Sequence, residues 1–452
     1  MPWIQNTDAD RAEMLSAIGV RSMEDLFEGI PAELRLSEPL PIDAGLSEDE
    51  LRREMAELSS WNSTLEGGSF LGAGLYRHFV PNVVDSLQNR HEFVTAYTPY
   101  QPEGSQGTLT AFFEFQTMVA ELYGLEVANA SMYDGCSAAV EAVIMASNMV
   151  RKRNKVVVSR GVHPHTRRSL ETYLRWTELE VVEAPLDADG RTDLGSLADD
   201  RTCAVLVQSP NTLGVIEDGK ALATTAKDAG AVAICSAYPT SLGLLESPGA
   251  QGFDIAVGEG QCLGTPPCFG GPSFGLFACS QKDVRRMPGR IVGQTVDEQG
   301  RRGFALTFQT REQHIRRAKA TSNICTNNAL IALRGAIYMA AAGPEGLAEV
   351  ASHSLAKAQY AAAQLGDLEG YSLPFEESGF FNEFVLRCPV PATEVNKAID
   401  RSGMIGGLAL ARWYPELGED ALLLAFTETT TRAQIDRLVN TLATLSSAAP
   451  VA

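Results

Sequence analysis

The sequence predicts an α/β fold in which helices cover both faces of a mostly parallel β-sheet. The main observation is the middle of the chain, where valine-rich runs alternate with helical spans in the order KVVVSR, RRSLETYLRW, EVVEAP, CAVLVQSPN, ALATTAKDAG and AVAICSAY. Runs that are apolar throughout are typical of parallel strands buried on both faces. The second observation is length, because 452 residues exceed what one hydrophobic core usually supports. We therefore expect a large α/β domain and at least one further domain.

Composition narrows the possible partners and the compartment. A net charge of −19, from 37 basic and 56 acidic residues, argues against nucleic acid and anionic membranes as partners. The first residues lack a basic segment followed by an apolar one, and no run of 18 apolar residues occurs, so secretion and membrane spanning are not expected. The eight cysteines show no CxxC pairing and no cluster with histidine. This pattern favours reduced cysteines in a cytoplasmic protein without a metal site.

Three domains are expected along the chain. Residues 1–60 are charged and helical, with Thr7 or Asp8 and then Ser47 as N-caps, and form either a solvated helical cap or an arm that wraps a partner subunit. Residues 61–335 hold the large α/β domain. Residues 336–452 form a smaller α+β domain, with helices at 344–365 and 392–402 and strands in GFFNEFVLRC and LLLAFTET.

The loop TAYTPYQPE is the first candidate site. Its two prolines favour a rigid, extended backbone that presents side chains in fixed directions. The candidates are Tyr97, Tyr100, Gln101 and Glu103. The alternative is a structural turn with buried tyrosines.

A second group of candidates lies where strands end and helices begin. Gly135, Cys136 and Ser137 precede a strong helix, where backbone N–H groups and the helix dipole favour an anion such as phosphate. His163 and Ser236 follow strands of the predicted sheet, and ligands of open sheets bind at that edge. His163 could stack on a ligand ring or serve only as a hydrogen-bonded loop residue. With His165 alone beside it, a metal is not expected.

The stretch GFDIAVGEGQCLGTPPCFGGPSFGLFAC, residues 252–279, looks like the cofactor-anchoring segment of a pyridoxal-phosphate (PLP) enzyme of the aspartate-aminotransferase fold. In such enzymes a buried strand ends in a loop that bears the lysine of the Schiff base. Here Gln261 stands at that place, and no lysine occurs between Lys227 and Lys282. An amide nitrogen cannot form an imine, so covalent PLP is not expected on this chain.

Several long motifs resemble the glycine cleavage system P-protein, glycine dehydrogenase (decarboxylating), across roughly Leu15 to Leu445. The resemblance is to the N-terminal half, which many prokaryotes encode as a separate subunit 1. The motifs, in the family's order, are TAYTPYQPEGSQGTLTAFFEFQT, ASMYDGCSAAVEA, VHPHTRRSLETY, VGEGQCLGTPPCFGGPSFGLFA and GFALTFQTREQHIRRAKATSNICTNNAL. The resemblance implies the fold of type I PLP-dependent transferases and a heterotetramer of two copies each of subunits 1 and 2.

The resemblance also implies a division of labour. Subunit 2 carries the lysine and PLP, which acts as an electron sink when glycine loses carbon dioxide. In this chain Gln261, or Cys262 in another alignment, replaces the lysine, and Ser236 replaces the acidic partner of the pyridinium. The cleft, including Gly135 to Ser137 and His163, would then be degenerate, and the TAYTPYQPE loop would complete the partner's site. The second substrate would be the lipoyl arm of H-protein, which receives the aminomethyl group.

Two alternatives to a composite enzyme site remain at this point. The chain could be a structural and docking scaffold for subunit 2 and H-protein, with no residue in the chemistry. It could also be an independent PLP enzyme that uses a distant lysine such as Lys319.

Overall fold

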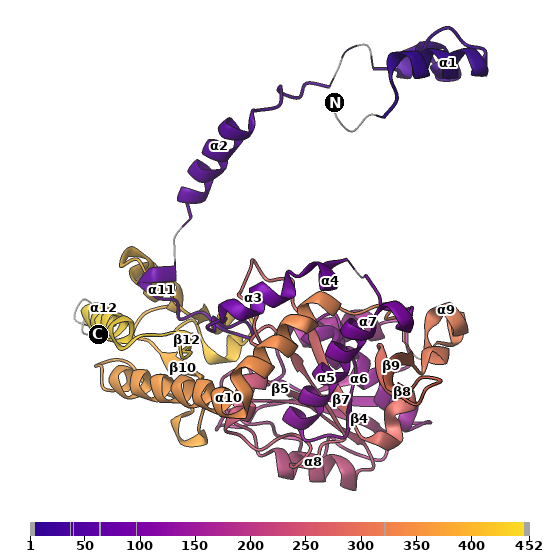
Figure 1. The fold of residues 1–452 in the computed structure, drawn as a ribbon. Coiled ribbons are helices and arrows are strands. Elements are labelled where there is room, and N and C mark those ends of the chain that lie inside the picture. The colour runs from indigo at the N-terminus through magenta and orange to yellow at the C-terminus, as the bar shows by residue number, and fades with distance from the viewer. Residues whose placement is uncertain are drawn as a thin grey trace. The chain divides into compact units, whose positions relative to one another are not determined.

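The computed structural model describes residues 5–36, 38, 40–62, 65–95, 97–320 and 322–446. The chain divides into two compact units, Met1–Ser63 and Thr64–Ala452, and Figure 1 draws both.

The first unit contains the helices α1 (Asp8–Ile18) and α2 (Glu48–Ser60). Both begin with a capping box in which the side chain of Thr7 or Ser47 accepts from the third backbone N–H of the helix, so these predicted caps are confirmed. None of the described residues in 5–62 is buried. The described residues of this unit therefore form no hydrophobic core of their own.

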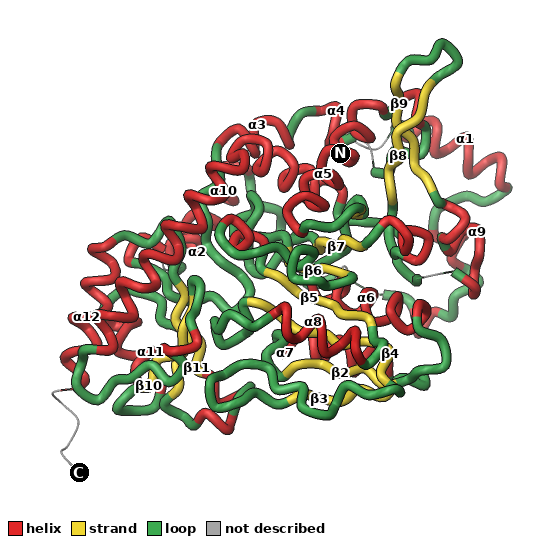
Figure 2. The backbone as a smooth tube through the Cα atoms, turned by 90° about the horizontal axis from the view of Figure 1, so that it is seen from below, coloured by secondary structure: helices red, strands yellow, loops and turns green. Residues whose placement is uncertain are grey.

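A seven-stranded sheet organises the second unit, in the order β1-β7-β6-β5-β4-β2-β3. The pairs from β3 through β6 are parallel, whereas β7 pairs antiparallel with both β6 and β1. Figure 2 shows these strands side by side. Their bounds are β1 Val127–Ala128, β2 Lys155–Ser159, β3 Glu180–Ala184, β4 Thr202–Ser209, β5 Val232–Ala237, β6 Ile255–Glu259 and β7 Gly275–Cys279. The valine-rich runs of the sequence are thus the strands that were predicted.

Each face of this sheet is covered by its own hydrophobic core. Alternate residues of one strand divide between the two cores: Val156 and Val158 of β2 belong to one, and Val157 belongs to the other. This alternation explains why the strands are apolar throughout. The covering helices are α5 (Gln106–Tyr123), α6 (Gly135–Met149), α7 (Pro164–Leu174), α8 (Gly219–Asp228) and the first part of α10 (Ala329–Gly366).

A three-stranded antiparallel sheet, β10-β12-β11, forms a separate layer near the C-terminus. It consists of β10 (Glu383–Arg387), β11 (Leu408–Ala409) and β12 (Ala421–Ala425), and it packs with the second part of α10 and with α11 (Ala392–Arg401) and α12 (Arg432–Ser446). The element α10 is interrupted at Gly343, whose φ of 63° and ψ of 179° are not helical. The helix predicted over 344–365 is therefore the second part of α10, and a first helical part precedes it from Ala329.

The remaining elements lie around the large sheet. They are α3 (Asn82–Gln88), α4 (His91–Val94), α9 (Gln313–Arg316) and the hairpin of β8 (Ile291–Val296) and β9 (Arg302–Thr307). Arg334 of α10 holds α3 in place, because its Nη1 donates to Asp85 Oδ1 at 2.6 Å and to Gln88 Oε1 at 2.5 Å.

Candidate functional site

The carboxyl ends of β4, β5 and β6 bring the predicted cleft residues together. Gln208 and Ser236 are paired in register on β4 and β5, and Ser236 is half-buried. Gln208 Oε1 accepts from the backbone N–H of His163 at 3.0 Å. Gln261 follows the end of β6.

The Gln261 side chain is buried and fully engaged by the backbone. Its Oε1 accepts from the N–H of Tyr76 at 2.9 Å, and its Nε2 donates to the carbonyls of Tyr76, at 2.9 Å, and Thr265, at 2.5 Å. Gln261, which stands at the predicted lysine position, thus binds the distant backbone of Tyr76 at the end of the sheet.

The predicted phosphate cup at the start of α6 already holds two carboxylates. Asp134 Oδ1 accepts from the backbone N–H of Ser137 at 2.7 Å, and Glu259 Oε2 accepts from that of Gly135 at 3.0 Å. Burial raises the pKa of Glu259, while its hydrogen bonds to Ser273 and Gly135 oppose that shift. The neighbouring Cys136 accepts from Thr166 Oγ1 at 3.4 Å. Two of the backbone donors that would cradle a phosphate, those of Gly135 and Ser137, are therefore bound to acidic side chains of the chain itself.

His163 serves as the N-cap of α7. Its Nδ1 accepts from the backbone N–H of His165 at 3.2 Å, and its Nε2 donates to the carbonyl of Ala73 at 3.0 Å. Burial, followed by the charge of His165, lowers the pKa of His163 to about 4. The imidazole is thus neutral near pH 7 and both of its nitrogens are occupied, so the structure gives it the role of a hydrogen-bonded loop residue.

Residues 70–78, which we call the cleft segment, connect the two sheets. Ala73 N–H and Tyr76 Oη donate to the carboxylate of Glu383 on β10, at 2.5 Å and 2.7 Å. His78 Nδ1 lies 2.6 Å from Glu428 Oε2. Burial raises the pKa of Glu383 to about 7, although both donors favour its ionised form. The cleft segment is therefore held by Gln261 and His163 on one side and by the small sheet on the other.

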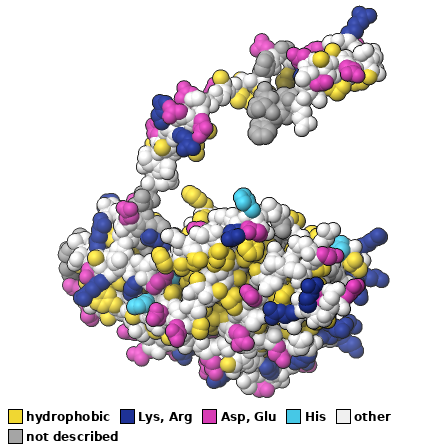
Figure 3. Space-filling view, in the orientation of Figure 1, with side chains coloured by type: hydrophobic (Ala, Val, Ile, Leu, Met, Phe, Trp, Pro, Cys, Tyr) yellow, Lys and Arg dark blue, Asp and Glu magenta, His cyan; other side chains and the backbone are white. Residues whose placement is uncertain are grey.

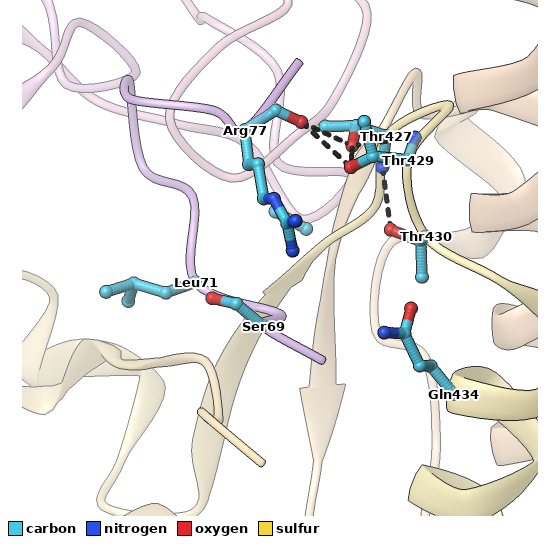
Figure 4. A pocket seen from close by; sticks show the side chains of 8 residues that line it. Ser69, Leu71, Arg77, Thr427, Thr429, Thr430 and Gln434 are labelled. Carbon is cyan, nitrogen blue, oxygen red and sulfur yellow. Dashed lines mark hydrogen bonds between the residues drawn. The ribbon is translucent and has the colours of Figure 1, made fainter. Parts of the chain in front are cut away.

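A small cavity of about 20 Å³ lies beside this segment, where β12 ends. Figure 4 shows Arg77 directed into it, and the hydroxyls of Thr427 and Thr429 bonded to the Arg77 carbonyl. Its remaining lining residues are Ser69, Leu71, Ala425, Thr430 and Gln434. None of the cleft residues predicted from the sequence lines this cavity.

The residues of the cleft do not fit PLP. A covalent attachment would need an amine where the Gln261 amide is hydrogen-bonded on both atoms. A phosphate at α6 would meet the carboxylates of Asp134 and Glu259. The cleft segment also contacts His163, whose Nε2 donates to the Ala73 carbonyl, in agreement with the second of its two predicted roles, a hydrogen-bonded loop residue.

The four loop candidates form a separate, exposed group. Tyr97 is 81% exposed and Tyr100 is 53% exposed, and Gln101 and Glu103 are exposed as well. Tyr100 Oη accepts from Arg290 Nη2 at 3.0 Å. The alternative of buried tyrosines is therefore wrong. Among the residues that the structure describes, no hydrogen bond joins this loop to the cleft residues.

Apolar side chains are exposed along the same part of the chain. Figure 3 shows hydrophobic atoms gathered over the region where Figure 1 draws α3, α5 and the adjoining end of α10. Exposed members of residues 79–100, which we call the 79–100 surface, are Phe79 at 66%, Val83 at 40%, Leu87 at 39% and Val94 at 45%, together with Tyr97 and Tyr100. A monomeric protein rarely leaves so many large apolar side chains exposed in one stretch.

Sequence reasoning missed three residues that organise these regions. Glu259 lies in GEGQ, beside the predicted anchoring position, and Glu383 is a carboxylate inside a predicted strand. Arg290 is a charged residue at the start of the apolar run RIVG and is only 4% exposed. A charge in an apolar run is the available signal, because burial of a charge requires a specific partner.

The described residues contain neither a cluster of metal-ligating side chains nor a membrane-spanning helix. No group of three or more His, Cys, Asp or Glu side chains there is arranged to hold a metal ion. No helix of that part of the chain has the length and apolar character needed to cross a membrane.

Comparisons with known proteins agree with this architecture. At 17% identity an aspartate aminotransferase from Thermus thermophilus superposes with a TM-score of 0.57 over 84% of this chain and 99% of its own, which confirms the predicted fold class. A crystal structure of glycine decarboxylase (P-protein) of the glycine cleavage system, in inhibitor-bound form, has a TM-score of 0.89 at 46% identity and covers 98% of this chain and all of its own.

Sequence comparisons point in the same direction. Proteins named probable glycine dehydrogenase (decarboxylating) subunit 1 are similar over nearly their whole length. The relative from Thermomicrobium roseum is 48% identical over 98% of this chain and 99% of its own, and that from Desulfitobacterium hafniense is 49% identical over 97% and 98%. The family model for the glycine cleavage system P-protein matches residues 1–442. The chain belongs to the glycine cleavage system P-protein family.

Proposed function

We propose that this chain is the cofactor-free subunit of a heteromeric, cytoplasmic glycine dehydrogenase (decarboxylating). It would act with a subunit 2 that carries PLP, in a complex of two copies of each subunit. The complex decarboxylates glycine and passes the aminomethyl group to the lipoyl arm of H-protein. The names of the relatives support the enzyme class and the existence of a partner subunit.

The main support for the cofactor-free role is the filled cleft. Gln261 binds the cleft segment through both of its polar atoms, and Glu259 occupies the backbone donor of Gly135. PLP supplies an electron sink for decarboxylation when it is bound, and this chain offers it neither an amine nor a free anion site here. The chemistry therefore belongs on the partner.

This chain contributes the TAYTPYQPE loop to the partner's site. The loop leaves Tyr100 partly exposed while Arg290 fixes its ring, so the hydroxyl is held in one direction before assembly. Gln101 and Glu103 add an amide and a carboxylate to the same exposed stretch. Preorganised polar groups of this kind orient a bound reactant and lower the cost of reaching the transition state.

The 79–100 surface is where subunit 2 docks. Its apolar side chains adjoin the polar loop, so burial of Phe79, Val83 and Leu87 would bring Tyr100 to the partner. Removal of apolar surface from water would drive the association. The stripe of Leu51, Met55 and Leu58 on α2 is exposed too and would bind the partner as an arm.

A second candidate function is a scaffold without any residue in the chemistry. The filled cleft suits a scaffold equally well, since neither role needs PLP on this chain. The two roles differ at the loop, because a scaffold does not need the Tyr100 hydroxyl or the Glu103 carboxylate.

Glycine–bicarbonate exchange tests the proposal. It should be measured with H-protein for this chain alone, for subunit 2 alone and for the mixture, where only the mixture should be active. Tyr100→Phe and Glu103→Gln should then leave assembly intact and lower turnover. Tyr173→Phe, which changes an exposed tyrosine of α7, is the matched control. Exchange by this chain alone would overturn the cofactor-free role, and full activity of both loop variants would favour the scaffold.

A further inference from the structure

Arg290 contacts both the ring and the hydroxyl of Tyr100, and it is much less exposed than Tyr100. Arg290 is 4% exposed, and its Nη2 donates to Tyr100 Oη at 3.0 Å and to the Cys325 carbonyl at 2.9 Å. Its Cζ lies 4.9 Å from the centroid of the Tyr100 ring. The backbone is anchored too, because the N–H of Ala130 donates to the Arg290 carbonyl at 2.8 Å. One side chain therefore fixes both the ring and the hydroxyl of Tyr100.

The direction of the hydrogen bond determines what Tyr100 can do. A guanidinium carries only donors, so the phenol oxygen must accept from Arg290. The hydroxyl proton of Tyr100 is then not used in this contact, and the side chain is 53% exposed. A charged donor also makes the bond stronger than one between neutral groups. Tyr100 thus keeps a hydroxyl proton that it can donate to another group.

The charge of Arg290 has no counterion in the described part of the chain. Its Nε and Nη1 are buried and have no hydrogen-bond partner there. The buried Arg334, by contrast, pairs with Asp85 at 2.6 Å. A buried, unpaired cation is costly and creates a positive potential in its surroundings. That potential favours an anionic acceptor for the hydroxyl proton of Tyr100.

We propose that Arg290 is a positioning residue that orients the Tyr100 hydroxyl as a hydrogen-bond donor to an anionic oxygen in the site of the partner subunit. This inference rests on the proposed function, because it requires that Tyr100 enters that site. The acceptor is a carboxylate or phosphate oxygen, and both occur there if glycine and PLP bind to the partner. Arg290 acts through Tyr100 and does not touch the reactants.

A double-mutant cycle in the assembled heteromer tests this inference. The variants are Arg290→Met, Arg290→Lys, Tyr100→Phe and Arg290→Met with Tyr100→Phe. Measurements are assembly, kcat and KM for glycine in the exchange reaction, and the dissociation constant of PLP. Tyr100→Phe should lower kcat/KM for glycine roughly 10- to 100-fold, as expected for one hydrogen bond to a charged group. Arg290→Met should cause a similar loss, and the double variant should be no worse than Tyr100→Phe alone.

The variants also identify the acceptor. If it is the glycine carboxylate, KM for glycine rises and PLP affinity is unchanged, whereas a phosphate acceptor weakens PLP binding. Arg290→Lys keeps the positive charge and should recover part of the activity even if Arg290→Met assembles poorly. Arg311→Met is the matched control, because Arg311 is a buried arginine whose Nη2 donates to the neighbouring Gly289 carbonyl at 2.7 Å. It should lower thermal stability without coupling to Tyr100→Phe.

Two outcomes overturn the inference. They differ in whether the composite site of the proposed function also falls. Additive losses from Arg290→Met and Tyr100→Phe would show that Arg290 has only a structural role, while the composite site would stand. Unchanged kcat, KM for glycine and PLP affinity in Tyr100→Phe would remove the composite site and this inference together.

Discussion

Gln261 brackets the backbone of Tyr76: its Oε1 accepts from the Tyr76 N–H at 2.9 Å, and its Nε2 donates to the Tyr76 carbonyl at 2.9 Å. The amide side chain supplies both the donor and the acceptor of this arrangement. The glutamine therefore stabilises the fold through these two hydrogen bonds, in addition to removing the amine that PLP would need.

Gln261→Lys should consequently fail to create a PLP enzyme. The ammonium group cannot accept from the Tyr76 N–H, so a buried donor loses its partner, which costs about 1–3 kcal/mol in the free energy of unfolding. We expect a lower Tm and no new absorbance band on addition of PLP. Gln281→Lys, at an exposed glutamine, should change Tm little. A PLP adduct at residue 261 that borohydride traps would contradict this prediction.

The strands of the large sheet could be predicted from the sequence, whereas the contacts of the cleft could not, because those contacts join residues that are far apart in the chain. A local apolar run predicts a strand such as 155–159. The caps Thr7 and Ser47 are likewise predicted from the residues that follow them in the sequence. The contact between Ala73 and Glu383 spans 310 residues, and no local pattern encodes it. The position of Gln261 in the sequence indicated that an amine is missing. Its hydrogen bonds to the cleft segment could not be predicted in the same way, because their partner Tyr76 lies 185 residues away.

Two buried carboxyl groups, those of Glu383 and Glu141, should make the free energy of unfolding depend on pH. Burial raises the pKa of Glu383 and of Glu141 to about 7 in each case. Between their ordinary values and pH 7 the folded chain binds more protons than the unfolded chain. The free energy of unfolding should therefore fall as pH rises through this window, by up to about 1.4 kcal/mol per pH unit for each carboxyl.

Denaturant unfolding of wild type and Glu383→Gln between pH 5 and 8 measures this effect. The glutamine keeps the shape of the protonated acid but cannot ionise, so the slope should become shallower in the variant. Adding Glu141→Gln should flatten it further. Equal slopes in wild type and the double variant would exclude these two groups as its source.

The 79–100 surface should be sensitive to charge without being needed for folding. Phe79→Asp places a carboxylate on a side chain that is 66% exposed, so the subunit alone should keep its Tm. In the heteromer the same carboxylate would be buried against the partner without a counterion, and the dissociation constant should rise at least about tenfold. Sedimentation or mass photometry of the mixture measures this.

Trp176→Asp is the matched variant for that experiment. Trp176 is 91% exposed and lies outside the 79–100 surface, so its replacement should leave the heteromer intact. Equal weakening by both variants would indicate a general effect of added negative charge, and no weakening by Phe79→Asp would place the interface elsewhere.

Glu259 should be needed to keep the start of α6 ordered. Its Oε2 accepts from Gly135 N–H at 3.0 Å and its Oε1 from Gln261 N–H at 3.1 Å, so one carboxylate joins the helix to the cleft. Glu259→Ala removes both acceptors and should lower the free energy of unfolding by about 1–3 kcal/mol. Glu259→Gln keeps an oxygen that can accept, so its loss should be smaller. Hydrogen exchange at Gly135 and Gln261 would report the change directly, because both amides lose their acceptor only in the alanine variant. Unchanged protection of these amides in Glu259→Ala would mean that the helix start is held by Asp134 alone.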